Sequence, residues 1–220
     1  MNHKITVIAA TGNMNKLREF REIFAESGID ADVLPAKIFG IEMPEETEET
    51  FEGNSMIKAK AIFDALKAGC DYPSIIKTDD YFVIADDSGL CVDALGGAPG
   101  VYSARYSEGY EDGPADDEKN IRKLLKALEN IPDKDRSAHF ACVISVISKD
   151  GLCFHEEGRF EGFINHGKEG DNGFGYDPVF YCPEYGKTSA EMTPEEKNAV
   201  SHRGKAVRLA VLRIRDLLGR

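Results

Sequence analysis

An apolar segment that ends in two adjacent carboxylates constrains the fold of this chain most strongly. Phe82-Val83-Ile84-Ala85 has the short, continuous apolar character of a buried strand, and Asp86-Asp87-Ser88-Gly89 follows it directly. A second buried strand is expected over residues 4–10, before a helix. In open α/β sheets, ligands bind where strands end. We therefore expect the two aspartates to lie at a binding site.

The rest of the chain alternates between helical and strand patterns. In the first helix, apolar side chains at Leu17, Phe20, Ile23 and Phe24 share one face, and Gly28 ends it. Further helices are expected over residues 50–68, over residues 116–129, from residue 193 and from about residue 201. The helix at 193–196 begins with a capping box and has proline at its first helical position. The apolar face of the helix over 50–68 comprises Ile57, Ala61 and Ala65, and that of the last helix comprises Val207, Ala210, Val211, Ile214, Leu217 and Leu218. A short strand over 32–34, an acidic loop over 36–49 and a hairpin of residues 138–148 and 152–164 complete the prediction.

Composition limits the classes of protein and partner. With 220 residues, 42% of them hydrophobic, the chain suits a single domain over residues 1–220 or two closely packed lobes. It has no run of 18 apolar residues, so we expect no membrane span. The five cysteines are scattered and form no CxxC pair, which indicates reduced thiols and a cytoplasmic protein. A net charge of -12 argues against non-specific binding to nucleic acid but permits a small anionic ligand.

The turn after the first strand is suited to phosphate. Thr11-Gly12-Asn13-Met14-Asn15-Lys16 combines a glycine turn with a helix N-terminus, where backbone N–H groups attract anions. Lys16 opposes the helix dipole in the first turn, and a bound anion would explain that position. The segment is not a Walker A motif, because the second glycine and the Lys-Ser/Thr pair are absent. An ordinary turn with a solvated lysine remains the alternative.

The acidic residues indicate a hard divalent cation. Adjacent strand residues point to opposite faces, so only one of Asp86 and Asp87 is expected to face the metal. Mg²⁺ prefers carboxylate and phosphate oxygens together. One or two glutamates of the run 42–52 are candidates for the same ion, and Asn54 and Lys58 share a helix face nearby in sequence. A solvated acidic loop is the alternative for most of these glutamates.

Two later segments have the composition of a base-binding site. Glycines in Gly173-Phe174-Gly175-Tyr176-Asp177-Pro178 allow close approach of the backbone, and an aromatic ring there can stack on a purine. His202-Arg203 at the start of the last helix supplies hydrogen-bond donors for a base edge or a phosphate. A core phenylalanine and a surface pair are the corresponding alternatives. The histidines at 3, 139, 155 and 166 have no zinc-site spacing.

Taken in order, these segments resemble the inosine triphosphate pyrophosphatase family, from about residue 5 to residue 217. The resemblance rests on Ala10-Thr11-Gly12-Asn13-x-x-Lys16-x-x-Glu19, Glu46-x-x-x-Thr50-Phe51-x-x-Asn54-x-x-x-Lys58-Ala59, Ala85-Asp86-Asp87-Ser88-Gly89-Leu90, Leu95-Gly96-Gly97-x-Pro99-Gly100-Val101-x-Ser103-Ala104-Arg105-Tyr106, Gly173-Phe174-Gly175-Tyr176-Asp177-Pro178-Val179-Phe180, Gly186-Lys187-Thr188-x-Ala190-Glu191-Met192 and Glu196-Lys197-x-x-x-Ser201-His202-Arg203-Gly204-x-Ala206.

The resemblance implies a mixed α/β fold with a curved central sheet, flanking helices and two lobes around a nucleotide-binding cleft. It implies Mg²⁺-dependent hydrolysis of ITP, dITP and XTP to the monophosphate and pyrophosphate by a homodimer. Glu46 and Asp87 would ligate the metal, and Asp87 would also be the general base. The implied nucleotide-binding residues are Thr11, Gly12, Asn13, Met14, Asn15, Lys16, Asn54, Lys58, Ser88, Phe174, Gly175, Tyr176, Asp177, Lys197, His202 and Arg203.

Two departures and three alternatives remain. Residues 70–82 are longer than in many members of the family, and Asp171-Asn172 replaces an expected Thr-Gly pair beside the base site. The alternatives are a pyrophosphatase for pyrimidine or modified nucleotides, a nucleotide sensor without turnover, and an acidic interaction module. Intact acidic residues argue against the sensor, and an interaction module leaves the glycines of residues 173–175 unexplained.

Overall fold

The computed structural model describes residues 4–69, 75–76 and 78–219. Its helices are α1 Met14–Glu26, α2 Phe51–Lys67, α3 Asp117–Ala127, α4 Pro194–Val200 and α5 His202–Leu217. Its strands are β1 Ile5–Ala9, β2 Ala31–Pro35, β3 Tyr81–Val92, β4 Ser137–Ser148, β5 Cys153–Ile164, β6 Phe180–Cys182 and β7 Lys187–Thr188. The mixed α/β class expected from the sequence is confirmed.

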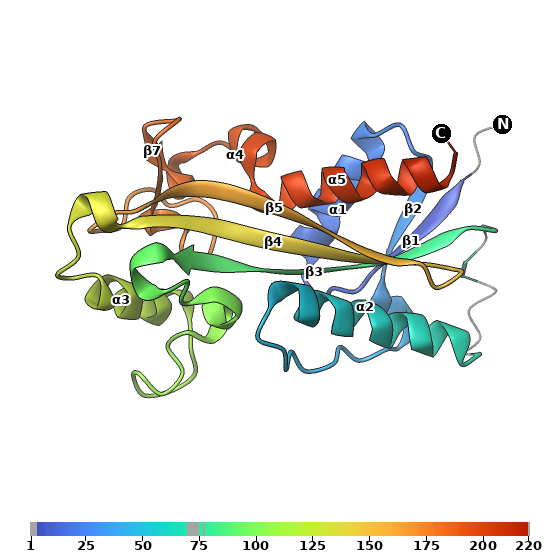
Figure 1. Cartoon of the computed structure of the whole chain (residues 1–220), viewed down its shortest axis with the longest axis horizontal. Helices are drawn as coiled ribbons and strands as arrows, with labels where there is room; N and C mark the ends of the chain where they lie inside the picture. Colours follow the sequence, from blue (N-terminus) through green and yellow to red (C-terminus); the bar gives the residue numbers. More distant parts are fainter. Residues whose placement is uncertain (1–3, 70–74, 77, 220) are drawn as a thin grey trace. The chain divides into compact units, whose positions relative to one another are not determined.

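The strands form one sheet in the order β2-β1-β3-β4-β5-β6-β7 (Figure 1). β1 pairs in parallel with both β2 and β3, whereas β6 pairs antiparallel with β5 and β7. β4 and β5 are the expected hairpin, turning at residues 149–152. The sheet is therefore mixed, with its parallel strands at the N-terminal edge.

The chain divides into two compact units. The first comprises residues 1–87, 142–158 and 203–220, and the second comprises residues 88–141 and 159–202. The single domain with two lobes expected from the sequence remains a prediction. No helix in the described parts of the chain is long and apolar enough to span a membrane.

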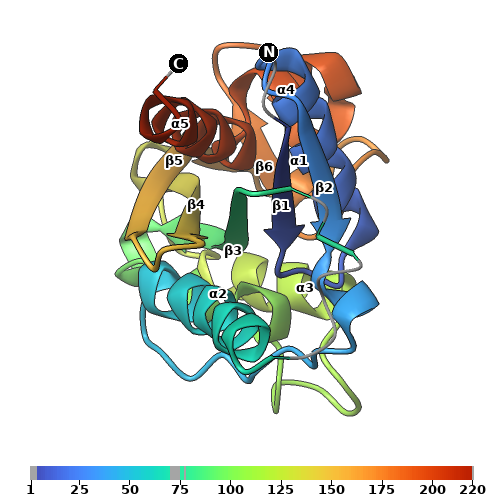
Figure 2. The ribbon, with the colours of Figure 1, turned by 90° about the vertical axis from the view of Figure 1, so that its right-hand side faces the viewer.

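In the first unit, α1 and α5 cover one face of the sheet and α2 covers the other (Figure 2). Strand alternation assigns the buried side chains to these faces. Phe82 and Ile84 pack in the cluster that contains side chains of α1 and α5, whereas Val83 and Ala85 pack with Ala59 and Ile62 of α2. This period of two continues to the residues that follow, so Asp86 and Asp87 are placed on opposite faces.

The second unit has its own apolar core. Leu90 and Val92 of β3 pack there with Ile121 and Leu124 of α3, together with Phe160 of β5. Thr193 begins α4 with the expected capping box, in which its side chain accepts from the Glu196 N–H, and Pro194 lies in the first turn. This helix carries Lys197.

The structure corrects three details. β3 does not end at the aspartates but continues to Val92, so the carboxylates lie within a strand. In α2 the fully buried face comprises Asn54, Ser55, Lys58, Ala59 and Ile62, and the expected apolar residues at 57, 61 and 65 are only partly buried. Leu217, expected on the apolar face of the last helix, is exposed. In the first two cases polar side chains occupy interior positions, which apolar periodicity does not detect.

Candidate active site

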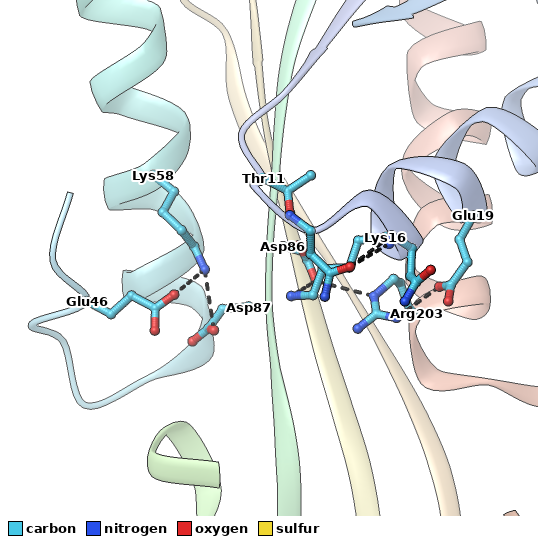
Figure 3. Close-up of polar contacts among 10 residues, drawn as sticks. Thr11, Lys16, Glu19, Glu46, Lys58, Asp86, Asp87 and Arg203 are labelled. Atoms are coloured by element: carbon cyan, nitrogen blue, oxygen red, sulfur yellow. Dashed lines mark hydrogen bonds and ion pairs between the residues drawn. The ribbon is translucent and has the colours of Figure 1, made fainter. Parts of the chain in front are cut away.

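Asp86 and Asp87 enter two separate clusters of charged side chains, one on each side of β3 (Figure 3). The expectation that neighbouring strand residues point apart is confirmed. Asp86 lies beside Lys16 of α1 and Arg203 of α5, while Asp87 lies beside Lys58 of α2. The two carboxylates therefore have different environments and different chemistry.

The Asp86 cluster is closed by ion pairs. The Asp86 Oδ2 atom lies 2.7 Å from Lys16 Nζ and 3.3 Å from Arg203 Nε, and Arg203 Nη1 donates to Glu19 Oε2 at 2.9 Å. Burial alone would raise the pKa of Asp86, but the positive charges of Lys16, Arg203 and Lys58 hold that pKa well below its ordinary value. Asp86 is thus a permanently ionised partner for two cations and a poor candidate for a proton acceptor.

The Asp87 cluster is less completely satisfied. Lys58 Nζ lies 2.5 Å from Glu46 Oε1 and 3.4 Å from Asp87 Oδ1. Asp87 Oδ2 is buried and has no hydrogen-bond partner among the residues that the structure describes. Burial raises the pKa of Asp87, with Glu46 and Asp86 adding to the rise and Lys58 opposing it. A buried carboxylate with an unsatisfied oxygen and a raised pKa is suited to a metal ion and to accepting a proton.

Asn54 explains how the glutamate loop reaches this cluster. Its side chain is buried in the first turn of α2, accepts from the Glu48 N–H at 2.9 Å and donates to the Glu48 carbonyl at 3.1 Å. Thr50 caps the same helix. These bonds fix the backbone two residues after Glu46. Asn54 therefore holds the loop that carries a metal-ligand candidate, and its side chain also lowers the pKa of Asp87.

The turn before α1 is capped by its own side chains. Asn13 is the N-cap and accepts from the N–H groups of Asn15 and Lys16, and Thr11 Oγ1 accepts from the Asn13 N–H at 3.1 Å. Gly12 has open space where a side chain would begin, and Met14 is 64% exposed. The turn is exposed to solvent and accessible to a ligand, although the Asn13 side chain already accepts hydrogen bonds from two of its backbone N–H groups.

Residues expected at the base lie together in the second unit. Lys197 Nζ donates to Asp177 Oδ2 at 2.5 Å and lies 5.4 Å from the centre of the Phe174 ring, which is 51% exposed. The Phe174 N–H donates to the same Asp177 oxygen at 2.9 Å. Gly173 has a φ of +82°, and a Cβ there would lie 2.1 Å from that oxygen, so only glycine fits. An aromatic ring is thus held partly exposed beside a cation.

Most of the other residues expected around the nucleotide contact other residues of the protein. The Tyr176 hydroxyl is buried and donates to the Ser103 carbonyl at 2.8 Å, and the Gly175 N–H donates to Asp117 Oδ2 at 2.8 Å. The His202 ring stacks on Phe140 at 5.1 Å, whereas the neighbouring Arg203 guanidinium pairs with Asp86 and Glu19. Ser88 is partly buried in β3, directly after Asp87.

Comparison with known proteins identifies the family. The Ham1 family profile matches residues 7–212. The chain belongs to the Ham1 family. It is 44% identical to a dITP/XTP pyrophosphatase of Yersinia pestis over 214 residues, covering 96% of this chain and 98% of the relative. A dITP/XTP pyrophosphatase of Bacillus cereus is 46% identical, with 92% and 91% covered.

Solved structures agree. A HAM1 protein from Coxiella burnetii has a TM-score of 0.82 at 36% identity, and the Ham1 protein of Staphylococcus aureus has 0.80 at 38%. Each comparison covers 96% of this chain and 99% of the other. The family resemblance read from the sequence motifs is confirmed, whereas the roles given to individual residues remain predictions.

Glu19 and Asp117 of this Ham1 chain were not predicted from the sequence as site residues, and the ion-pair partners of Asp86 were not predicted either. Glu19, quoted only as part of a motif, binds Arg203, and Asp86 pairs with Lys16 and Arg203. Asp117 accepts from the Gly175 N–H. The position of Glu19, three residues after Lys16 on the same helix, was an available signal. The contact of Asp117 joins residues 58 positions apart, for which one sequence holds no signal.

Proposed function

We propose that this chain hydrolyses the non-canonical purine nucleotides dITP, XTP and ITP to the monophosphate and pyrophosphate, which would remove them from the nucleotide pool. Its membership of the Ham1 family and the names of its relatives support this activity. The observation that carries the chemistry is the buried Asp87 carboxylate, which has an unpartnered oxygen and lies beside Glu46 and Lys58.

We propose Mg²⁺ as the cofactor, because the donor set fits it. Glu46 and Asp87 offer hard carboxylate oxygens, and the unpartnered Asp87 Oδ2 is a ready ligand. No group of three or more acidic, histidine or cysteine side chains that could hold a metal occurs within the described ranges. Mg²⁺ is commonly held by one or two carboxylates together with water and substrate phosphates, so two ligands suffice. When bound, the ion supplies charge neutralisation at the phosphate oxygens.

The residues of the first unit act on the triphosphate. Asp87 accepts a proton from a water molecule as the water oxygen forms a bond to the α-phosphorus. The bond from that phosphorus to the α–β bridging oxygen breaks, and pyrophosphate leaves. Lys16 and Lys58 donate to the phosphates, and residues 11–15 hold them with backbone and side-chain donors. A raised pKa makes Asp87 a better base than an exposed aspartate.

The residues of the second unit act on the base. The half-exposed Phe174 ring offers a stacking face for a purine, and the Lys197–Asp177 pair provides a donor beside it. Inosine and xanthine carry a 6-oxo acceptor, whereas adenine carries a 6-amino donor. A donor aimed at position 6 therefore favours the former and leaves a mismatch with ATP. His202, Ser88 and the backbone around residue 203 complete the predicted set.

The reaction products test this proposal directly. Purified protein incubated with dITP or XTP and Mg²⁺ is expected to release pyrophosphate and one equivalent of monophosphate, and EDTA is expected to stop the reaction. Release of orthophosphate and diphosphate would contradict the assignment. We also propose that the protein is cytoplasmic, as its scattered cysteines indicate, and that it is a homodimer, as the resemblance implies. Light scattering in solution measures the mass of the assembly, and the mass of a single chain would contradict the homodimer.

A further inference from the structure

The Lys58 ammonium is a buried cation between two carboxylates. Its side chain is 9% exposed, and Nζ lies 2.5 Å from Glu46 and 3.4 Å from Asp87. Glu46 is part of the loop before α2, Lys58 lies within α2, and Asp87 belongs to β3 (Figure 3). The ammonium thus joins three segments of the first unit at the point where the two proposed metal ligands meet.

The charge balance of this cluster disfavours a second cation beside the Lys58 ammonium. Glu46 and Asp87 carry two negative charges, and Lys58 neutralises one of them. A divalent ion between the same carboxylates, with Lys58 still in place, would set three positive charges against two negative ones. Like charges at such distances inside a protein repel strongly. The neighbouring Asp86 does not neutralise this excess positive charge, because it already pairs with Lys16 and Arg203.

We infer that Lys58 is the resident cation of the Glu46–Asp87 pair in the nucleotide-free chain and is exchanged for the divalent metal when the triphosphate binds. The inference rests on the proposed function in one respect, the assignment of Glu46 and Asp87 as metal ligands. A lysine carries its charge on a flexible four-carbon stem, so the ammonium can move to a new partner without moving α2. The phosphates supply that partner.

Two consequences follow from the exchange. The metal binds weakly on its own, because it competes with Lys58, and it binds well together with the nucleotide, because the phosphates then accept the displaced ammonium. Metal and triphosphate therefore strengthen each other's binding. In the absence of both, the ammonium holds Glu46 against α2, which keeps the loop close to its working position.

Mn²⁺ binding to the nucleotide-free protein, followed by electron paramagnetic resonance, tests the exchange. Lys58→Met removes the competing charge and is expected to tighten Mn²⁺ binding by about tenfold or more. Lys58→Arg retains a cation and is expected to bind Mn²⁺ as weakly as wild type. Lys60→Met is the matched control, since Lys60 lies on the same helix, exposed and paired with Asp64. Equal or weaker Mn²⁺ binding by Lys58→Met would overturn the inference.

Two further measurements keep the test decisive. If Lys58→Met fails to fold, ¹³Cε-lysine NMR of the wild-type protein replaces it, with the Lys58 signal assigned by its loss in Lys58→Arg. Mg²⁺ added with pyrophosphate is expected to shift that signal and leave Lys60 unmoved, and an unmoved Lys58 signal would refute the exchange. In the Lys58→Met background, Glu46→Gln is expected to abolish the gain in Mn²⁺ binding. A gain that survives Glu46→Gln places the ion elsewhere and refutes the ligand assignment, independently of whether pyrophosphate is released.

Discussion

Replacing Asp87 by asparagine should separate catalysis from folding. The substitution keeps the shape of the side chain but removes its negative charge and its ability to accept a proton. A positioned general base contributes about a hundredfold to ten-thousandfold to turnover. We therefore expect turnover of dITP to fall at least about a hundredfold, which corresponds to about 2.7 kcal/mol in activation free energy.

The fold is expected to survive this change. Lys58 keeps its closer partner, because Glu46 lies at 2.5 Å and Asp87 only at 3.4 Å. Burial raises the pKa of Asp87, which means that the folded state disfavours its ionised form at neutral pH. For a carboxyl with a raised pKa, stability is highest at low pH and falls as the pH rises towards the folded pKa. Removing the charge should therefore leave the melting temperature unchanged or raise it.

The assay is a coupled pyrophosphate-release measurement, with thermal unfolding followed by circular dichroism. Asp64→Asn is the matched control, because Asp64 is an exposed carboxylate on α2 that pairs only with Lys60 in the contacts observed. It is expected to retain wild-type turnover. A well-folded Asp87→Asn protein with near-normal turnover would refute the role of Asp87 as base and metal ligand.

Three other variants probe the remaining parts of the site. Lys16→Ala is expected to weaken nucleotide binding or turnover by roughly tenfold or more, the scale of a lost charge-assisted hydrogen bond, and unchanged kinetics with ITP would contradict its role. Asp86→Asn is expected to destabilise the chain by about 3 kcal/mol, because the buried Arg203 keeps only Glu19 and the partly buried Lys16 loses its carboxylate, and this is measured by urea unfolding. Since the pKa of Asp86 is lowered, its stabilisation is present above about pH 4 and is lost as the pH falls, so the variant should show a smaller loss of stability in acid. Phe174→Ala is expected to raise KM for dITP several-fold with little change in melting temperature, because the ring is half exposed, and an unchanged KM would remove it from the base site.

The sequence predicted the order of elements well where side-chain periodicity is strong. β1, α1 and the β4–β5 hairpin lie within one or two residues of their expected bounds. The end of β3 was predicted wrongly, because aspartate, serine and glycine usually mark a turn. Here ion pairs with Lys16, Arg203 and Lys58 stabilise two carboxylates inside a strand. Such pairing depends on helices distant in sequence, which local propensity cannot represent.

The candidate site was predictable as a set of residues but not as an arrangement. The motifs named both Glu46 and Asp87, and the structure places both beside Lys58. The motifs also grouped His202 with Arg203, although the His202 ring stacks on Phe140 and the Arg203 guanidinium pairs with Asp86. Helix periodicity separates these neighbours by about a hundred degrees, so adjacency in sequence is a poor guide to their shared function.

Pyrophosphate release from non-canonical purine nucleotides is best measured as kcat/KM for ITP, XTP, dITP, GTP, ATP and dTTP at one Mg²⁺ concentration. We expect pyrophosphate as the product and kcat/KM values for ITP, XTP and dITP at least about a hundredfold above the value for ATP, the discrimination that a donor–acceptor mismatch supplies. Equal values for ATP and ITP, or a preference for dTTP, would contradict it.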